Sequence, residues 1–311
     1  MQTVSTLDFA RRGRRYLRRA ALAPVAAAAL ALLLAAFLAH PARAAEAQAA
    51  IVPDWGAISA PAPAPARAIG GYARGCLGGA VALPAVGTGY QVMRLSRKRY
   101  YGHPELIAFI QAFAKKARAD GWPGLLVGDM AQPRGGPILT GHASHQIGLD
   151  ADIWFTPAPA RRLSADERET MSATSMVAVN TMTVDRSVWS SRQLRLLRTA
   201  ASFPEVERIF VNPAIKRAAC AEAGKDRAWL AKIRPWWGHT SHFHVRLRCP
   251  PGDTACLAQE PLPAGDGCDS GLDWWFSAEA QPKAGPPATG SRRRFDFADL
   301  PPACRGIFFS G

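Results

Sequence analysis

Acidic residues are scarce in this sequence. Its 311 residues include 24 Asp and Glu against 38 Lys and Arg, which gives a formal net charge of +14 at pH 7. With 20% charged and 48% hydrophobic residues, the composition excludes a disordered chain and is typical of a globular protein. The chain also lacks a G-x-G-x-x-G sequence, a Walker sequence and internal repeats, so the corresponding nucleotide-binding and solenoid classes are disfavoured.

The longest hydrophobic run lies near the start of the chain. Six arginines between residues 11 and 19 precede an Ala/Leu-rich run over 20–39, and Ala-Arg-Ala follows at 42–44. This order predicts a cleaved signal peptide over 1–44. An uncleaved membrane anchor is the alternative, because about 20 apolar residues can span a bilayer. We expect export, and no stable membrane span once the leader is removed.

The exported part is still basic. Residues 1–44 contain seven arginines and one aspartate, which leaves +8 for residues 45–311. Outside the cytoplasm, a basic surface favours cell-wall polymers and lipid headgroups more readily than nucleic acid. No Lys/Arg cluster interleaved with aromatic residues is present in 45–311, so we expect no nucleic-acid partner. Ordinary solubility is the alternative reason for the charge.

The sequence contains few cysteines, and their number is even. The six cysteines are Cys76, Cys220, Cys249, Cys256, Cys268 and Cys304. An even number in an exported chain predicts three disulfides, although spacing alone leaves the pairing open. Cys249 and Cys256 are too far apart for the C-x-x-C spacing of a zinc knuckle, which favours structural pairing over metal binding.

The periodicity predicts an α+β domain over 71–311, in which a small antiparallel sheet is flanked by helices. We expect an Ala/Pro-rich, flexible lead-in over 45–70 and ordered structure from about Cys76. We also expect a loop-rich C-terminal tail, which is of low complexity over about 277–295. We expect helices from 104 to about 120, 164 to about 179, 191 to 201 and 213 to about 224, and a short one near 225–233. Strands are expected at 124–130, 206–212 and 242–249.

Three of the seven histidines lie within six positions, in WWGHTSHFHVRLRC at 236–249. In a strand, His242 and His244 share one face, and the apolar residues between and after them share the other. Two neutral imidazoles on one face suit a metal site, whereas a solvated strand face is the alternative.

A second polar stretch, GHASHQIGLDADIWF at 141–155, contains His142, His145, Asp150 and Asp152. His145 and Asp152 are seven residues apart, so on a straight strand they would face opposite sides. Gly148 allows a bend that brings them together. Two histidines and a carboxylate would leave one metal position open, as in hydrolytic zinc sites.

These motifs resemble a known family. SHQIGLDAD followed far downstream by H-x-H is similar to the zinc peptidases that include lysostaphin-like enzymes, D-Ala-D-Ala dipeptidases and hedgehog domains. More narrowly, GHASHQIGLDADI, RIFVNPAIK, RPWWGHTSHFHVRLRCP and GDGC resemble the penicillin-insensitive murein endopeptidases of the Gram-negative periplasm. The similarity covers most of residues 70–304, and the motifs follow the family's order.

The resemblance implies that one catalytic Zn²⁺ is held by His145, Asp152 and His244. In the wider superfamily a glutamate often stands three residues before the first histidine of H-x-H, and here that position is His239. A histidine suits the role of general base, while capping a turn is its structural alternative. His242 would contact the water or the oxyanion, or act by orienting other groups.

Other residues near the motifs have open roles. His142 would orient a ligand or bind an accessory metal ion, with a plain surface position as the alternative. Asp150 is expected to hydrogen-bond locally or contact substrate. Asp129 would form part of a substrate wall. Trp236 would floor a cleft or belong to the core.

The family resemblance also implies disulfides from Cys76 to Cys304, Cys220 to Cys268 and Cys249 to Cys256. The implied function is a periplasmic zinc endopeptidase that hydrolyses peptidoglycan cross-links, with D-alanyl-meso-diaminopimelyl as the expected bond. The sequence lacks the S-x-x-K and K-T-G set of penicillin-binding enzymes, so indifference to β-lactams is expected. The alternatives are a non-catalytic wall-binding or partner-binding protein, and a carboxypeptidase or dipeptidase of the same superfamily.

Overall fold

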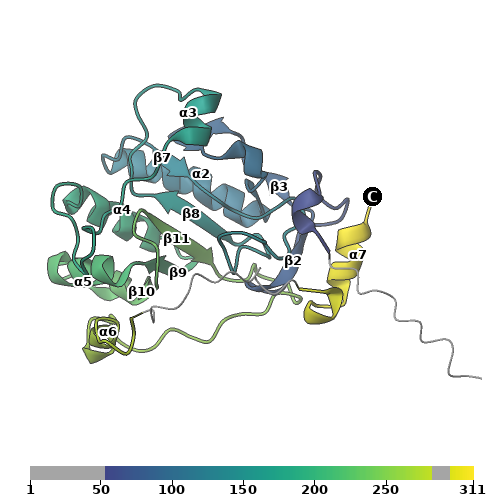
Figure 1. Ribbon diagram of the computed structural model, residues 1–311. Helices are drawn as coiled ribbons and strands as arrows, with labels where there is room; N and C mark the ends of the chain where they lie inside the picture. Colours follow the sequence, from purple (N-terminus) through teal and green to yellow (C-terminus); the bar gives the residue numbers. More distant parts are fainter. Residues whose placement is uncertain (1–52, 282–294) are drawn as a thin grey trace, which may run out of the picture. The chain divides into compact units, whose positions relative to one another are not determined.

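The computed structural model describes residues 53–281 and 295–311, and these described residues form one compact unit (Figure 1). The predicted leader at 1–44 lies outside the described residues, as does most of the low-complexity segment. The unit is α+β, as expected. None of the described helices is both long and apolar enough to cross a membrane.

A mixed sheet of seven strands carries the site, in the order β10-β9-β11-β8-β7-β5-β4. The strands are β4 (Val86–Gly87), β5 (Tyr90–Val92), β7 (Leu125–Val127), β8 (Asp150–Trp154), β9 (Val206–Val211), β10 (Ile233–Pro235) and β11 (His242–Leu247). Neighbours are antiparallel except β7 with β5 and β10 with β9, which are parallel. The prediction of a small antiparallel sheet was therefore correct for the other neighbouring strands but wrong for these two pairs. Each parallel pair is joined through a helical connection, the crossover that parallel neighbours require.

Two smaller antiparallel sheets complete the strands. β1 (Arg67–Gly71) pairs with β2 (Arg74–Gly78), and β3 (Val81–Ala82) pairs with β6 (Tyr101–Gly102).

The flexible lead-in expected over 45–70 was wrong for its described part. Trp55 is 1% exposed in the 3₁₀ turn η1 (Trp55–Ala57), and its ring lies 5.0 Å from that of Phe308 near the other end of the chain. The Ala/Pro-rich composition suggested that little could be buried there. The missing partner is α7 (Ala303–Phe309), about 250 residues downstream, which local composition cannot reveal.

The expected helices are largely confirmed. α2 (Pro104–Ala119), α4 (Ser191–Ala201) and α5 (Pro213–Glu222) match their predicted ranges closely, and Asn212 caps α5 through Ala214 N–H. A further helix, α6 (Ser270–Trp274), lies in the predicted loop-rich tail. The segment 225–233 forms only the 3₁₀ turn η3 (Ala228–Lys232).

One helix is much shorter than expected. α3 (Ala165–Thr170) has the predicted capping box between Ser164 and Glu167, but it ends well before residue 179. Beyond it, Thr174 N–H donates to the Thr156 hydroxyl, and the Ser175 hydroxyl bonds the backbone of Val177. Such local side-chain bonds to the backbone compete with helix continuation.

The core lies between the sheet and the helices, and α2 crosses behind the sheet in Figure 1. Phe243, Val245 and Leu247 of β11 are fully buried in it, as the alternation predicts, and the Phe243 ring lies 6.4 Å from that of Phe113 on α2. The opposite face of β11 is therefore left to its histidines.

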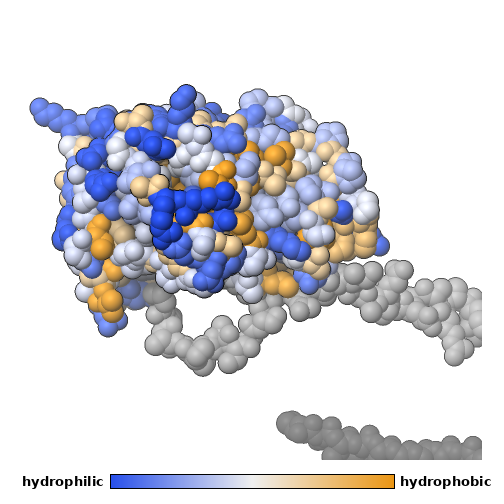
Figure 2. All heavy atoms as spheres, turned by 90° about the horizontal axis from the view of Figure 1, so that it is seen from above, coloured by the Kyte–Doolittle hydropathy of each residue, from blue (hydrophilic) through white to orange (hydrophobic). Residues whose placement is uncertain are grey.

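All three disulfides pair as the resemblance implied: Cys76 with Cys304, Cys220 with Cys268 and Cys249 with Cys256. Seen from above in the view of Figure 2, the surface is mostly hydrophilic with scattered apolar patches.

Candidate metal centre

The site begins with the register of two antiparallel strands. His244 on β11 lies directly opposite Asp152 on β8, and Arg246 lies opposite Asp150. Directly opposed residues on one face are the closest side-chain neighbours of an antiparallel pair. Strand pairing therefore brings together two groups that are far apart in sequence.

His145 reaches the same place through the predicted bend. Gly148 has φ +72°, and a Cβ there would lie 2.4 Å from Leu77 Cδ2 and 2.9 Å from His103 N. No residue other than glycine fits that close approach. His145 itself has φ +69°, a left-handed conformation uncommon for a non-glycine residue, and its backbone N–H donates to Asp150 Oδ2. Backbone strain of this kind gathers at functional sites.

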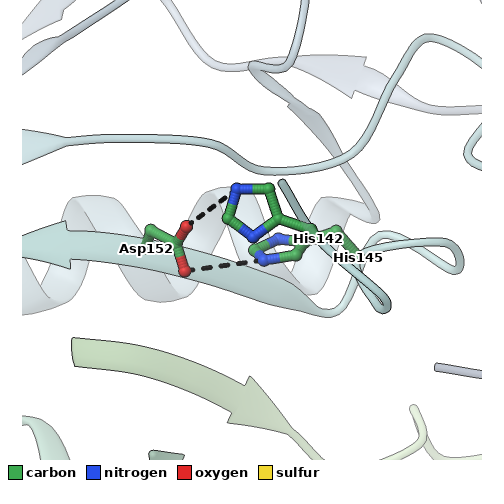
Figure 3. Close-up of side chains that lie close together, drawn as sticks. All are labelled: His142, His145 and Asp152. Carbon is green, nitrogen blue, oxygen red and sulfur yellow. Dashed lines mark ion pairs between the residues drawn. The ribbon is translucent and has the colours of Figure 1, made fainter. Parts of the chain in front are cut away.

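The Asp152 carboxylate is the centre of the cluster. Its Oδ1 lies 3.5 Å from His145 Nε2 and 3.3 Å from His244 Nδ1. Its Oδ2 lies 3.5 Å from His142 Nε2 and 3.8 Å from His242 Nε2. Figure 3 shows His142 and His145 both directed at this carboxylate.

Several of these buried atoms have no hydrogen-bond partner. Both ring nitrogens of His145 and Asp152 Oδ1 are buried without one. Buried polar atoms are normally paired, so a cluster of orphaned donor atoms calls for a missing partner. Imidazole nitrogens with a carboxylate oxygen are the donor set that zinc and similar divalent ions prefer. The residues therefore fit a divalent metal ion.

The structure groups His142 with His145 and Asp152, because their ligand atoms all lie within 4.8 Å of one another. The predicted set held His244 in the place of His142. His244 is equally close to the carboxylate, at 3.3 Å. His145 and His244 thus approach Oδ1 of Asp152, and His142 approaches Oδ2.

Asp150 is the member of the site whose role the sequence left open. It is fully buried, and Arg246 donates to both of its oxygens, at 2.7 and 2.9 Å. Asp150 Oδ1 also lies 3.2 Å from His244 Nε2. Burial opposes its charge, but the Arg246 and His244 charges outweigh burial and hold the pKa of Asp150 well below its usual range.

The same pairing fixes the chemistry of His244. Burial works against its protonation, yet Asp150 and Asp152 raise the pKa of the imidazole. Each ring nitrogen faces a carboxylate, Nε2 that of Asp150 and Nδ1 that of Asp152, so a metal ion bound at Nδ1 would leave the ring proton on Nε2, beside Asp150. For Asp152, burial is opposed mainly by His242 and His145, and its pKa stays well below the usual range.

His239 lies on a turn beside the cluster. Gly238 and His239 have φ of +70° and +50°, and His239 Nδ1 lies 2.9 Å from the Trp237 carbonyl, to which it donates. The proton is thereby placed on Nδ1 and the lone pair on Nε2. Burial, then the nearby His244 and His242, lower the pKa of His239 to about 3, so the ring is neutral near pH 7.

His242 lies next to His239. Its ring lies 5.1 Å from that of His239, and burial lowers its pKa. It lines a cleft of ≈ 240 Å³ together with Asp152 and His142.

Asp129 lies behind the site as a buried charge. Its Oδ2 accepts from Arg97 at 3.0 Å and Arg99 at 2.9 Å, and lies 3.0 Å from His142 Nε2. Burial is outweighed by these partners, which lower the pKa of Asp129 to about 2. Asp129 also lines the cleft, where a residue of the predicted substrate wall would lie. The same carboxylate orients His142. No local sequence pattern indicated that Arg97 and Arg99 would be its partners.

Trp236 belongs neither to the core nor to the wall of this cleft. It is 55% exposed, and its ring lies 6.0 Å from Phe210 and 6.2 Å from Trp275. Phe210 in turn contacts His244, ring to ring at 5.5 Å. The exposed Trp236 is therefore linked through Phe210 to His244 on β11, on the side of α6.

Comparisons with known proteins identify the family of the chain. A family model described as penicillin-insensitive murein endopeptidase matches residues 68–308. A protein of that name from Haemophilus influenzae is 48% identical over 246 residues, which cover 75% of this chain and 85% of the relative. Proteins of the same name from Klebsiella pneumoniae and Pectobacterium atrosepticum are 44% and 42% identical over 253 and 258 residues, with 81% of this chain covered in both cases and 90% and 88% of the relatives. The chain belongs to the penicillin-insensitive murein endopeptidase family.

Proposed function

We propose that this chain is an exported, zinc-dependent endopeptidase that hydrolyses peptide cross-links of peptidoglycan. The observation that carries the proposal is the group of buried, unpartnered donor atoms around Asp152, on a chain of this family. The expected bond is the D-alanyl-meso-diaminopimelyl amide, and the expected compartment is the periplasm. The relationship to hedgehog and D-Ala-D-Ala peptidase domains belongs to the same proposal, supported by the antiparallel strand pair that presents the donors.

The residues that would hold the zinc are His145 through Nε2, Asp152 through Oδ1 and His244 through Nδ1. A bound zinc of this kind polarises a carbonyl and lowers the pKa of a coordinated water to about 7. His142 is an additional donor on the Oδ2 side, which suits an accessory ion or the orientation of Asp152.

The remaining histidines would handle the proton and the developing charge. His239 donates from Nδ1 to the Trp237 carbonyl and carries its lone pair on Nε2, where it would accept the proton of the attacking water. His242 lines the cleft beside Asp152, where its Nε2 would hydrogen-bond the oxygen that becomes negative during attack. Neither role needs an acyl-enzyme, which is why β-lactams should not inhibit.

The test uses the exported chain, purified without chelator, and cross-linked muropeptides. We expect dimers to be converted to monomers, detected by chromatography with mass spectrometry. EDTA should abolish the conversion, Zn²⁺ should restore it, and penicillin should leave it unchanged. His145→Ala and His244→Ala should each reduce the rate by at least about 1000-fold because the metal would lose a ligand. Arg195→Gln, at an exposed position on α4, is the matched control. Undiminished hydrolysis by either histidine variant would refute the proposal.

A further inference from the structure

The cleft beside the metal site has a second wall that the proposed chemistry does not use. It is lined on one side by His142, Asp152 and His242, and on another by Arg94 and Arg97. Both arginines flank the 3₁₀ turn η2 (Leu95–Arg97), which is packed against α3. Two guanidinium groups therefore share one hollow with the proposed catalytic atoms.

These two arginines differ in their partners. Arg97 donates to Asp129 Oδ2. The same oxygen also contacts Arg99 and His142, so the three side chains share one negative charge. For Arg94, no carboxylate of the described chain lies within 4.0 Å of the guanidinium. Its guanidinium instead donates to a neutral group, the Met171 carbonyl, at 2.9 Å. Arg94 thus brings to the wall a positive charge that has no direct ion pair among the described residues.

Arg94 is held firmly in this position. Its φ of +58° is left-handed, and its backbone N–H donates to the Arg168 carbonyl. Glu169 accepts from both the backbone N–H and the hydroxyl of Ser96, which joins α3 to η2. Glu169 is therefore engaged with Ser96 rather than with Arg94. A strained, braced arginine without an ion-pair partner is arranged for a ligand that arrives from outside.

We propose that Arg94 and Arg97 form a carboxylate-binding subsite, which recognises a free carboxylate on the substrate next to the scissile amide. The inference rests on the proposed function and names the feature of the substrate that the same cleft would recognise. In a D-alanyl-meso-diaminopimelyl cross-link, the carbon that bears the amide nitrogen also bears a free carboxylate. A guanidinium pair is the side-chain chemistry best matched to that group, because it binds both oxygens.

The experiment compares two synthetic cross-linked peptides that differ in one group. The carboxylate beside the scissile nitrogen is free in one peptide and a carboxamide in the other. We expect the zinc-loaded wild-type chain to have a kcat/KM roughly 10- to 100-fold higher for the free carboxylate, the range of one charge-assisted hydrogen-bond set. Most of this ratio should reside in KM, and it should fall at high salt.

Two variants locate the preference. Arg94→Gln should reduce the carboxylate-to-carboxamide ratio to near one, and Arg94→Lys should keep part of it because charge remains but the planar fork is lost. Arg97→Gln should lower the ratio less, since its charge is shared with Asp129. Arg195→Gln, an exposed arginine on α4 that bonds Ser191, should keep the wild-type ratio. Zinc content and melting temperature, measured for each variant, show that the fold is intact.

The outcomes separate the two proposals. Equal cleavage of both peptides by the wild-type chain would overturn the carboxylate subsite and leave the endopeptidase proposal standing. A wild-type preference that survives in both Arg94→Gln and Arg97→Gln would also overturn it. Cleavage of neither peptide by zinc-loaded protein would overturn both proposals.

Discussion

At the scale of single residues, the site depends on a carboxylate that does not itself bind the metal in our proposal. Asp150 lies between Arg246 and His244, and its Oδ1 is 3.2 Å from His244 Nε2. With a metal ion on Nδ1, the ring proton would lie on Nε2, where the Asp150 carboxylate would stabilise that tautomer. Outer partners of this kind are worth about 10- to 100-fold in metal affinity.

We predict that Asp150→Asn weakens zinc binding by about 10- to 100-fold, measured by competition with a chromophoric chelator. The metal-free variant should also lose about 3 kcal/mol of unfolding free energy in urea, because Arg246 is left as a buried charge without its counter-charge.

The double variant Asp150→Asn/Arg246→Gln separates these effects. It removes both charges, so much of the lost stability should return, while the weak zinc affinity should persist because His244 still lacks its carboxylate. Glu279→Gln, at an exposed carboxylate, is the control and should change neither quantity. Recovery of zinc affinity in the double variant would contradict the tautomer argument.

Sequence reasoning found the histidines and Asp152 but not their supports, and the reason is geometric. The alternation of β11 correctly placed His242 and His244 on the face opposite Phe243. The alternation does not determine the register of β11 against β8, and it is this register that places Asp150 opposite Arg246. Arg97 and Arg99 are 32 and 30 residues from Asp129, in a turn with no distinctive pattern, so nothing local linked them.

At the scale of secondary-structure elements, caps and amphipathic faces were enough to locate α2, α4 and α5. Short strands such as β4, β5 and β10 were missed because two or three residues carry no detectable period, and their pairing depends on the helices that connect them. These connections also explain why β5 pairs with β7, and β9 with β10, in parallel.

A buried lysine joins several of these elements. Lys216 on α5 is fully buried, and its Nζ donates to the Leu230 carbonyl of η3 and to the Asp266 carbonyl next to the Cys268 disulfide. Burial, followed by the Arg234 charge, lowers the pKa of Lys216 to about 8 from 10.5.

The stability of the protein should therefore respond to alkaline pH through this residue. Between pH 8 and 10.5 the unfolded chain keeps the lysine proton that the folded chain has released, so the unfolding free energy should rise with pH. The contribution is complete above pH 10.5 and lost below pH 8. We predict that the difference between wild type and Lys216→Met, measured by urea unfolding, grows by about 3 kcal/mol across this window.

The hydrogen bonds that Lys216→Met removes lower stability but produce no such slope. Lys225→Met, at an exposed position, should run parallel to wild type at every pH. A pH-independent difference between wild type and Lys216→Met would show that the buried ammonium keeps its ordinary proton affinity.

At the scale of the whole molecule, the disulfides close loops of very different length. Cys76 on β2 and Cys304 on α7 are 228 residues apart, whereas Cys249 and Cys256 are separated by 7. Both ends of the long loop are buried, and the cluster around them includes Trp55 and Leu300. The chain's two described ends are thus joined covalently and by packing.

The loop lengths make the stability contributions unequal. Cross-linking stabilises mainly by reducing the entropy of the unfolded chain, an effect that grows with the logarithm of loop length and gives about 5 kcal/mol for the long loop and about 2 kcal/mol for the short one. We predict losses in this order for Cys76→Ala/Cys304→Ala and Cys249→Ala/Cys256→Ala, measured by urea unfolding without reductant. If α7 were to detach by itself, hydrogen exchange would increase in residues 303–309 while the global unfolding free energy stayed near the wild-type value. That result would mean that α7 and Trp55 form a separate unit of stability, and it would contradict a single cooperative fold held from β2 to α7.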